Sequence, residues 1–224
     1  MKTIILSLGG SLIAPDKIDI KFLKNFKKTI EKFVRKGFKF VIVCGGGKTA
    51  RNYQEGLFKI VGNNQEALDW VGISATHLNA FLMRCIFHKQ SDRNIIENPN
   101  KKIKSNQKII LAGGWKPGWS TDYDAVLLAK NLKSNILINM SNIDYVYDKD
   151  PKKHKSAKKI KNICWKHFRK MIGSKWKAGL NAPFDPIAAK EAERLKLNVF
   201  VIGKNLRNFE NLLNDKEFKG TIIE

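Results

Sequence analysis

Cysteine is scarce in this chain of 224 residues, and the cysteines that occur are dispersed. Cys44, Cys85 and Cys164 form no CxxC pair, and their odd number argues against a disulfide framework. We therefore expect reduced thiols, most of them in the core, and a cytoplasmic protein. The four histidines show none of the spacings that are typical of metal ligands, so the sequence predicts no metal site built from side chains.

Long apolar runs are also absent. No stretch approaches the roughly 18 consecutive apolar residues that a membrane helix needs, so no membrane association is expected. The apolar start "MKTIILSL" breaks at Gly9 and Gly10 without a small-residue cleavage site, which favours a buried first strand over a signal peptide. With 43% hydrophobic residues, no repeat and no clear linker, residues 1–224 are expected to form a single domain.

Acidic residues are few beside the basic ones. The chain has 42 Lys and Arg against 20 Asp and Glu, a formal net charge of +22. Such a charge raises nucleic-acid binding as a hypothesis. However, the lysines are spread along the chain, and the densest cluster, "KDPKKHKSAKKIKN", has no interleaved aromatic residues that could stack on bases. The pattern favours a basic surface around a site for anionic metabolites, with nucleic acid not an expected main partner.

Two kinds of apolar segment alternate along the chain. Compact apolar runs predict buried strands at residues 2–8, 38–44, 108–112, 135–140 and 198–203, and a short one at 220–224. Apolar residues at spacings of three and four predict helices at residues 20–36, from about 48 onward, and at 65–87, 124–132 and 186–196. This alternation predicts an α/β fold, a three-layer α/β/α sandwich with a mainly parallel central sheet.

The stretch "VIVCGGGKTAR" ends an apolar run in three glycines, a lysine and a threonine. A Walker A phosphate loop would need a glycine where Ile42 stands, so that motif is excluded. Two other predicted strands end in Gly9-Gly10 and Gly113-Gly114. Ligands of open α/β sheets bind beyond the carboxyl ends of the strands, and glycine lets phosphate oxygens approach backbone amides closely. Three such strand ends predict an anion or nucleotide site.

Two polar loops also follow predicted strands and place polar and charged side chains at the carboxyl ends of those strands. "GGWKPGWSTDYDAV" places Ser120, Thr121 and Asp122 where they can cap a helix, but its lysine and tryptophans exceed what a cap requires. "SNIDYVYDKDP" brings Asp144, Asp148 and Asp150 together with two tyrosines. Such a loop is either an aspartate-rich turn or a cradle for a base, a ribose or a hydrated magnesium ion.

The order of motifs carries a resemblance to a known family. "SLGGSL", "GGGKTAR", "GISATHLNAFLM", "PGWSTDYDAVLLA", "SNIDYVYDKDP", "FDPIAAKEAERL" and "GTIIE" follow one another along the whole chain. In this order and spacing the chain resembles the amino acid kinase superfamily. Within that superfamily it is most similar to the uridylate (UMP) kinases of the archaeal type.

The resemblance implies transfer of the γ-phosphoryl group of Mg-ATP to the phosphate of UMP, in pyrimidine nucleotide synthesis, with Mg²⁺ accompanying ATP. It implies an ATP site that contains Gly9, Gly10, Ser11, Gly47, Arg51, Ser141, Asn142, Tyr147 and Asp150. It implies a UMP site that contains Gly46, Asp69, Trp115, Lys116, Pro117, Gly118, Trp119, Ser120 and Thr121. It also implies a homo-oligomer, a hexamer built from dimers.

Lys48 and Asp122 are the expected catalytic residues. Phosphoryl transfer needs in-line positioning and positive charge around the transferred group. Lys48 can supply that charge, because a cation at a helix N-terminus opposes the macrodipole unless an anion is nearby; a solvated lysine is the alternative. Asp122 matches an aspartate that orders cationic groups in related kinases. No general base is required, since a phosphate monoester oxygen is already a nucleophile.

Some residues depart from the family pattern. Tyr145 replaces a glycine beside the expected adenine site, Ser7 stands where a charged residue is usual, and His77 replaces an arginine. Trp115, Lys116 and Trp119 replace small, hydroxyl or imidazole residues. Two alternatives therefore stay open: another small-molecule kinase of the superfamily, such as an isopentenyl phosphate kinase, or a nucleotide-binding homologue without transfer activity. The glycine loop lacks the histidine that is usual in the isopentenyl phosphate branch, which disfavours that alternative.

Overall fold

A seven-stranded sheet forms the centre of the computed structural model, which describes residues 2–149, 151, 153–173 and 183–224. The strand order is β3 (Ile109–Ala112), β2 (Lys39–Cys44), β1 (Thr3–Leu8), β4 (Ile136–Met140), β8 (Asn198–Ile202), β9 (Thr221–Ile223) and β7 (Asn162–Ile163). The first five strands are parallel, β9 is antiparallel to β8, and β7 is parallel to β9. The predicted mainly parallel sheet is confirmed.

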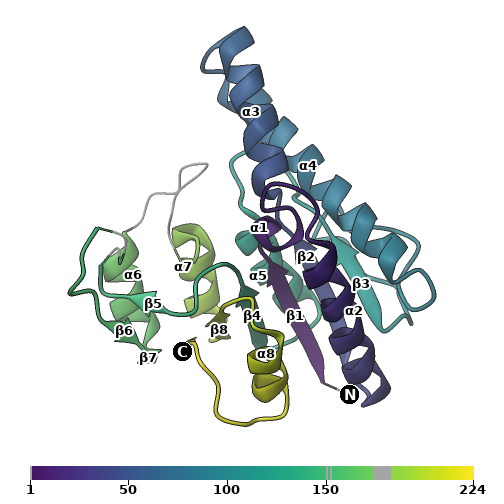
Figure 1. Cartoon of the computed structure of the whole chain (residues 1–224), viewed down its shortest axis with the longest axis vertical. Helices are drawn as coiled ribbons and strands as arrows, with labels where there is room; N and C mark the ends of the chain where they lie inside the picture. The colour runs from purple at the N-terminus through teal and green to yellow at the C-terminus, as the bar shows by residue number, and fades with distance from the viewer. Residues whose placement is uncertain (1, 150, 152, 174–182) are drawn as a thin grey trace.

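Alternating side chains of the central strands enter two separate apolar clusters, one on each face of the sheet. Ile4, Leu6 and Phe40 belong to the cluster that includes α2 (Ile20–Arg35), α8 (Leu206–Leu213) and the end of α4 (Gln65–Ile86). Ile5 and Val41 belong to the cluster that includes α5 (Thr121–Asn131), α6 (Trp165–Ile172) and α7 (Pro186–Arg194). Strands buried on both faces explain the continuous apolar runs of the sequence. Helices on both sides of the sheet confirm the three-layer α/β/α sandwich (Figure 1).

Helix ends follow the local signals of the sequence. The side chain of Asp19 accepts a hydrogen bond from the N–H of Phe22 (2.9 Å) at the start of α2, and Gly37 has a φ of 88° just beyond its end. Ser120 accepts from the N–H of Tyr123 (3.2 Å) at the start of α5. These side chains satisfy amides that a helix leaves without a partner in its first turn.

Several short elements were not anticipated from the sequence. They are α1 (Gly10–Ile13), α6, α8, β7 and a separate hairpin of β5 (Val146–Tyr147) with β6 (Lys159–Ile160). Strands of two residues have no measurable periodicity, and α1 is only four residues long. α6 and α8 do carry apolar residues at helical spacing, but within short and strongly polar surroundings.

The fold shows where the cysteines lie and how long and apolar the described helices are. The expectation that the cysteines mostly fill the core is wrong for two of the three: all are free, but only Cys44, in β2, is buried, whereas Cys85 and Cys164 are exposed. Burial raises the pKa of the Cys44 thiol to about 12. Among the helices of the described residues, none combines the length and the apolar content that crossing a membrane requires.

The helices α3 (Gly47–Val61) and α4 pack against each other, and α3 projects beyond the sheet (Figure 1). Ala50 is the only buried residue of α3, and the tip of this helix exposes Phe58, Ile60 and Val61. α4 differs, because Asp69, Ala75, Thr76, Asn79, Ala80 and Met83 form a buried stripe. Three of these six residues are polar, and buried polar side chains need hydrogen-bond partners.

Candidate active site

Two glycine loops meet at the carboxyl ends of the neighbouring strands β1 and β2. The N–H of Gly9 donates to the carbonyl of Met140 (2.8 Å), and the N–H of Gly45 donates to the carbonyl of Leu8 (2.9 Å). The loops are so close that a Cβ atom on Gly10 would overlap the backbone of Gly45 and Gly47. We call Gly9–Gly10 together with Gly45–Gly47 the glycine junction. Only glycine fits at Gly10 and Gly47, and Gly47 also has a φ of 65°, which other residues adopt rarely.

Asn79, a residue of the buried stripe of α4, orients the glycine junction. Its side-chain amide donates to the carbonyls of Gly45 (2.7 Å) and Gly46 (3.3 Å), and only 2% of Asn79 is exposed. In a trans peptide the carbonyl and the following N–H point in opposite directions. The N–H groups of Gly46 and Gly47 therefore point away from α4. Gly47 also begins α3, so the positive end of that helix dipole lies at the same place and favours an anion.

The loop that follows β3, residues 113–119, is fastened to α4 and α5 through its backbone. Thr76 Oγ1 accepts a hydrogen bond from the N–H of Gly114 (2.7 Å), and His77 Nε2 lies 2.8 Å from the carbonyl of the same glycine. Asp69 Oδ2 accepts from the N–H of Gly118 (2.8 Å), while Asp69 Oδ1 accepts from Gln65 (2.7 Å). Together with Asn79, Thr76 and Asp69 of α4 hold two strand-end loops in place, namely the glycine junction and the 113–119 loop.

Aromatic and cationic side chains cover this 113–119 loop. The ammonium group of Lys116 lies 4.4 Å from the ring centroid of Trp115 and 5.2 Å from that of Trp119. Trp119 in turn stacks on Tyr123 with centroids 4.2 Å apart. Cation–π and stacking contacts of this kind stabilise a loop that lacks regular backbone pairing. The residues that depart from the family pattern thus interact with one another.

A cluster of three carboxyl groups lies beneath the 113–119 loop. Asp122 Oδ1 accepts from Ser7 Oγ (2.9 Å) and from the Asn139 amide (3.3 Å), and Asp122 Oδ2 accepts from the N–H of Asp185 (3.4 Å). Asp124 Oδ2 accepts from the N–H of Trp115 (3.1 Å). Ser7, which stands where the family usually has a charged residue, is therefore a hydrogen-bond donor to Asp122.

Burial makes this cluster hold protons more tightly than ordinary carboxyl groups do. Loss of hydration raises the pKa of Asp122 to about 6, opposed by the Ser7 hydrogen bond and assisted by the charge of Asp185. Loss of hydration also raises the pKa of Asp124 to about 7, opposed by the Trp115 N–H and assisted by both neighbouring aspartates. Asp124 is fully buried, and its Oδ1 has no hydrogen-bond partner within the described part of the chain. Proton loss near neutral pH would therefore leave a poorly solvated charge under the loop.

The carboxyl groups of the cluster accept hydrogen bonds from donors of the protein itself. In the described part of the chain, no group of three or more His, Cys, Asp or Glu side chains could hold a metal ion. The three aspartates are instead used as hydrogen-bond acceptors for Ser7, for the Trp115 N–H and, at the start of α7, for the N–H of Ala188 (2.7 Å). This geometry does not fit a magnesium ion held by protein carboxylates alone.

The segment of residues 141–147 crosses the other half of the same sheet edge. The N–H of Ser141 donates to Ile202 (3.0 Å), and that of Val146 donates to Thr221 Oγ1 (2.8 Å). Asn142, Asp144 and Asp148 are exposed. Tyr147 pairs with Lys159 in the β5–β6 hairpin, and the ammonium group of Lys159 lies 5.2 Å from the ring centroid of Tyr145. The backbone of this segment is anchored, whereas much of its polar surface is open to solvent.

The structure brings together many of the residues that the sequence singled out. Gly9, Gly10, Gly46 and Gly47 lie in or beside one junction, and a Cβ atom on Gly9 would contact Ser141 at 3.4 Å. Asp69 contacts the predicted loop through Gly118. Ser11 and Lys48 are half-buried, in α1 and at the start of α3, while Arg51 one turn later is exposed. Asp150 lies outside the described residues.

Sequence reasoning missed the residues that hold these loops. Thr76, Asn79, Asp124 and Asp185 were not singled out, although each has a hydrogen bond to the loops or the carboxyl cluster. One signal was available: Asp69, Thr76 and Asn79 are polar residues at intervals of seven and three, and therefore share one face of the predicted helix. That face is otherwise apolar, so polar residues on it indicate buried hydrogen-bond partners.

Comparisons with known proteins agree with this geometry. The sequence pattern described as the amino acid kinase family matches residues 2–203. The uridylate kinase of Thermoplasma volcanium is 36% identical over 228 residues, covering 100% of this chain and 98% of the relative. The crystal structure of the uridylate kinase from Archaeoglobus fulgidus superimposes with a TM-score of 0.85 at 31% identity, covering 100% of both chains. The UMP kinase structure from Bacillus anthracis has the same fold, with a TM-score of 0.80 at 21% identity over 100% of this chain and 96% of that one. The chain belongs to the amino acid kinase family.

Proposed function

We propose that this protein is a UMP kinase that transfers the γ-phosphoryl group of ATP to UMP and releases UDP and ADP. The observation that carries the proposal is the glycine junction, where two strand-end loops touch through their backbones and Asn79 turns the amides of Gly46 and Gly47 away from α4. Amides and a helix N-terminus at one point suit phosphate oxygens. Relatives that cover the full length of the chain are named uridylate kinases, which supports UMP as the acceptor.

The two substrates are assigned to opposite sides of the junction. On the ATP side we place Gly9, Gly10, Ser11, Gly47, Arg51, Ser141, Asn142, Tyr147 and Asp150. On the UMP side we place Gly46, Asp69, the loop of Trp115, Lys116, Pro117, Gly118 and Trp119, and the helix start at Ser120 and Thr121. Each oxygen of Asp69 accepts one hydrogen bond from the protein and keeps a lone pair, so it can also accept from a ribose hydroxyl.

The proposed step needs little covalent help from the protein. A non-bridging oxygen of the UMP phosphate attacks the γ-phosphorus of ATP, the bond from that phosphorus to the β–γ bridging oxygen breaks, and ADP leaves. The amides of the junction and the side chain of Lys48 would offset the charge of the two polyphosphates. Asp122 would orient the polar groups around the centre through Ser7 and Asn139. Mg²⁺ would enter with ATP rather than occupy a site made by the protein.

Assembly and location are part of the proposal. The exposed apolar side chains of α3 and α4, among them Phe58, Ile60 and Leu78, suit contacts between copies of the chain. We propose a homo-oligomer, a hexamer built from dimers, with residues 1–224 of each copy as a single kinase domain. The proposed location is the cytoplasm, and the proposed role is in pyrimidine nucleotide synthesis.

A coupled assay of ADP release tests the proposal. The purified chain is given Mg-ATP with UMP, CMP, AMP or isopentenyl phosphate in turn, and the phosphorylated product is identified. We expect UMP to give the highest kcat/KM. Turnover confined to another acceptor would replace UMP kinase by a different small-molecule kinase of this family. No ADP with any acceptor would contradict both kinase functions and favour a nucleotide-binding homologue.

A further inference from the structure

The positive charge of the chain is uneven, because acidic residues are missing from one long segment. No Asp or Glu occurs between Asp150 and Asp185, whereas eleven of the 42 Lys and Arg residues lie there. Residues 151–184 therefore carry half of the formal net charge of +22. Within this segment, residues 153–173 are described by the structure and include β6, β7 and α6. We call residues 153–173 the basic lobe.

Helix α6 separates the apolar side chains of the basic lobe from its lysines. Trp165 and Phe168 are buried in the core, and the indole N–H of Trp165 donates to the carbonyl of Leu197 (2.9 Å). Lys166 and Lys170 are exposed and lie one turn apart on the other side of the helix. The core thus fixes the helix in an orientation that presents both lysines to solvent.

The connection from β5 to β6 presents further lysines. The N–H of Lys158 donates to the carboxylate of Asp148 (2.8 Å), and the N–H of Asp148 donates to the carbonyl of Lys158 (3.2 Å). Lys153, Lys155 and Lys158 have exposed side chains. Ile160 of β6 packs against the same apolar cluster as α6, and Figure 1 shows the hairpin and α6 at one end of the molecule. The two sets of lysines therefore belong to one surface.

The lysines of this surface are not neutralised by the protein. Within the described residues, none of the five lysines named above takes part in an ion pair. Arg169 differs, because it pairs with Glu193 of α7 at the border of the lobe. Unpaired ammonium groups gathered on one surface repel one another and attract a ligand that carries many negative charges.

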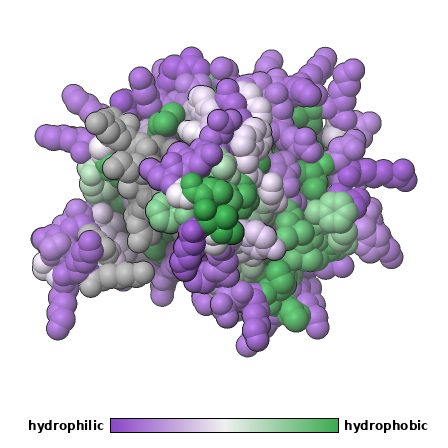
Figure 2. Space-filling view, turned by 90° about the horizontal axis from the view of Figure 1, so that it is seen from above, coloured by the Kyte–Doolittle hydropathy of each residue, from purple (hydrophilic) through white to green (hydrophobic). Residues whose placement is uncertain are grey.

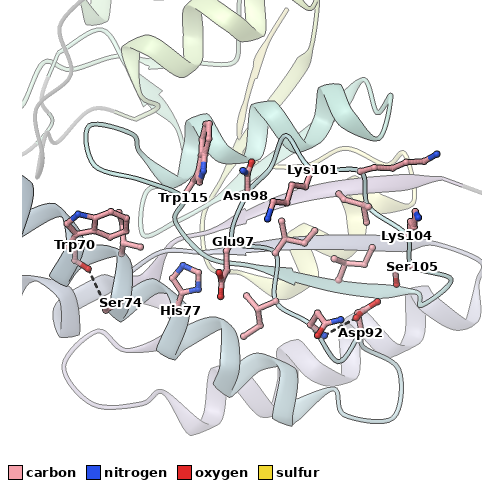
Figure 3. A pocket seen from close by; sticks show the side chains of 17 residues that line it. Trp70, Ser74, His77, Asp92, Glu97, Asn98, Lys101, Lys104, Ser105 and Trp115 are labelled. Carbon is pink, nitrogen blue, oxygen red and sulfur yellow. Dashed lines mark hydrogen bonds between the residues drawn. The ribbon is translucent and has the colours of Figure 1, made fainter.

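Other lysine-rich surfaces of the molecule include acidic residues. On α2, Lys27 lies 3.9 Å from the carboxylate of Glu31. The hollow of about 830 Å³ beside β3 contains Glu97 as well as Lys101 and Lys104 (Figure 3). The basic lobe is distinguished from these surfaces by charge of one sign along an uninterrupted segment of the chain.

The surface of the basic lobe offers cations without an apolar anchor. The large apolar side chains that are exposed in the described structure lie elsewhere, among them Phe58, Ile60 and Leu78 of α3 and α4. Figure 2 shows the larger green groups of apolar side chains in the centre and on the right, whereas Figure 1 places the hairpin and α6 on the left. Amphipathic binding to a membrane surface buries an apolar face, and single-stranded nucleic acid stacks its bases on aromatic rings. Duplex DNA needs neither, because it presents about one negative charge per 1.7 Å of its axis.

We propose that the basic lobe binds double-stranded DNA through its phosphates, without reading the base sequence. The absence of interleaved aromatic residues in "KDPKKHKSAKKIKN" disfavours stacking on bases, but contacts with phosphates require only cations and other donors. Lysine donates hydrogen bonds and accepts none, which suits phosphate oxygens, whereas recognition of an RNA duplex relies on its 2′-hydroxyl groups. This binding is additional to the proposed kinase activity and does not depend on it.

Binding is measured by the fluorescence anisotropy of a labelled DNA duplex of about 20 base pairs, titrated with the intact chain at about 50 and 200 mM KCl. We expect a dissociation constant of about 1–100 μM at physiological salt, and values within about twofold for two duplexes of unrelated sequence. K155Q/K166Q/K170Q should weaken binding about tenfold and reduce the slope of log K against log salt by about three, one for each lost phosphate contact. Bound DNA should also slow hydrogen exchange at residues 153–173.

A matched variant separates this surface from general attraction by a basic protein. K21Q/K24Q/K28Q removes the same charge from exposed positions of α2 and should leave binding within about twofold. Equal weakening by both triple variants would overturn the proposal in favour of general attraction, and so would no binding at about 50 mM KCl. An RNA duplex of equal length that binds about tenfold more tightly would also overturn it. Lobe-dependent binding to phosphatidylserine vesicles without DNA binding would assign the surface to membranes instead.

Discussion

The two halves of the sheet edge that carry the candidate site are built differently. Over β1, β2 and β3, the glycine junction and the 113–119 loop are held by side chains of α4 that lie in the interior, such as Asn79 and Thr76. Over β4 and β8, residues 141–147 are held mainly through their backbone, and Asn142 and Asp144 remain exposed. The difference teaches that the glycine junction and the 113–119 loop are fixed by the core before a ligand arrives, whereas residues 141–147, on the proposed ATP side, present open polar groups.

Alanine substitutions at two glycines, one over each half of the sheet edge, should differ most strongly in their effects on turnover and stability. In Gly10→Ala the new methyl group would overlap the backbone of Gly45 and Gly47, which cannot turn aside, whereas in Gly203→Ala it would meet the flexible carboxylate end of Asp144. We expect Gly10→Ala to lose turnover and about 3 kcal/mol or more of unfolding free energy, and Gly203→Ala to lose much less. Urea denaturation and the coupled assay measure both.

Gly56→Ala is the control for these substitutions. No atom lies within 4 Å of a Cβ placed on Gly56, which is inside α3. Alanine has a higher helix propensity than glycine by about 1 kcal/mol, so this variant should be as stable as the parent or more stable. Similar losses in Gly10→Ala and Gly203→Ala would show that the two halves are equally rigid.

Lys48 stands at the boundary between the halves, in the first turn of α3. If its charge stabilises the transferred phosphoryl group, Lys48→Ala should lower kcat about 100-fold and leave the KM for UMP nearly unchanged. Steady-state kinetics with each substrate varied in turn provide the measurement. An unchanged kcat would remove Lys48 from the catalytic residues and identify it as a solvated lysine.

Asn79→Ala tests whether the interior really fixes the UMP side. The substitution leaves the carbonyls of Gly45 and Gly46 without their donor, which costs about 1–3 kcal/mol of unfolding free energy when the group is buried. The KM for UMP should rise about tenfold, the change that about 1.4 kcal/mol produces. Asn25→Ala, at an exposed position of α2, is the control and should change stability by less than about 0.5 kcal/mol. An unaltered KM in Asn79→Ala would contradict the role assigned to this amide.

Much of this site could be predicted from the sequence, and the limits have physical causes. The glycine ends of β1, β2 and β3 were predictable because a buried strand that stops at glycine has a local signature. The partners of those loops were not, because Asn79 reaches Gly45 across 34 positions and Asp124 reaches the loop only after the chain folds back at Ser120. Contacts of this kind depend on how α4 and α5 are placed against the sheet.

The same reasoning explains the error with cysteine. Cys44 is buried because it lies within an apolar strand, but Cys85 and Cys164 lie at the ends of helices, where burial depends on the neighbouring elements. The fold class was predictable because two-sided burial gives continuous apolar runs. The two-residue strands β5, β6 and β7 were not, since their pairing depends on distant segments.

Asp124→Asn should have the smallest effect on turnover, because asparagine can still accept a hydrogen bond from the N–H of Trp115. The substitution should instead change how the free energy of unfolding depends on pH. The folded protein raises the pKa of Asp124 from 3.8 to about 7, so this group contributes stability fully below about pH 4, and the contribution is lost as the pH rises through about 7. Each pKa unit corresponds to about 1.4 kcal/mol. Relative to Asp124→Asn, the parent should therefore become less stable between pH 4 and 7 in urea titrations. A difference independent of pH would contradict the buried, proton-binding state of Asp124.

The account rests on the assignment of UMP to the side of the 113–119 loop and of ATP to the side of residues 141–147, with the glycine junction between them. One crossed measurement tests it most directly. KM values for UMP and for ATP are determined in Asp69→Ala, which removes the partner of Gly118, and in Asn142→Ala, which alters the exposed 141–147 segment. We predict that Asp69→Ala raises the KM for UMP about tenfold or more with the KM for ATP little changed, and that Asn142→Ala does the reverse. Variants that raise both constants equally, or that show the opposite pattern, would contradict the assignment.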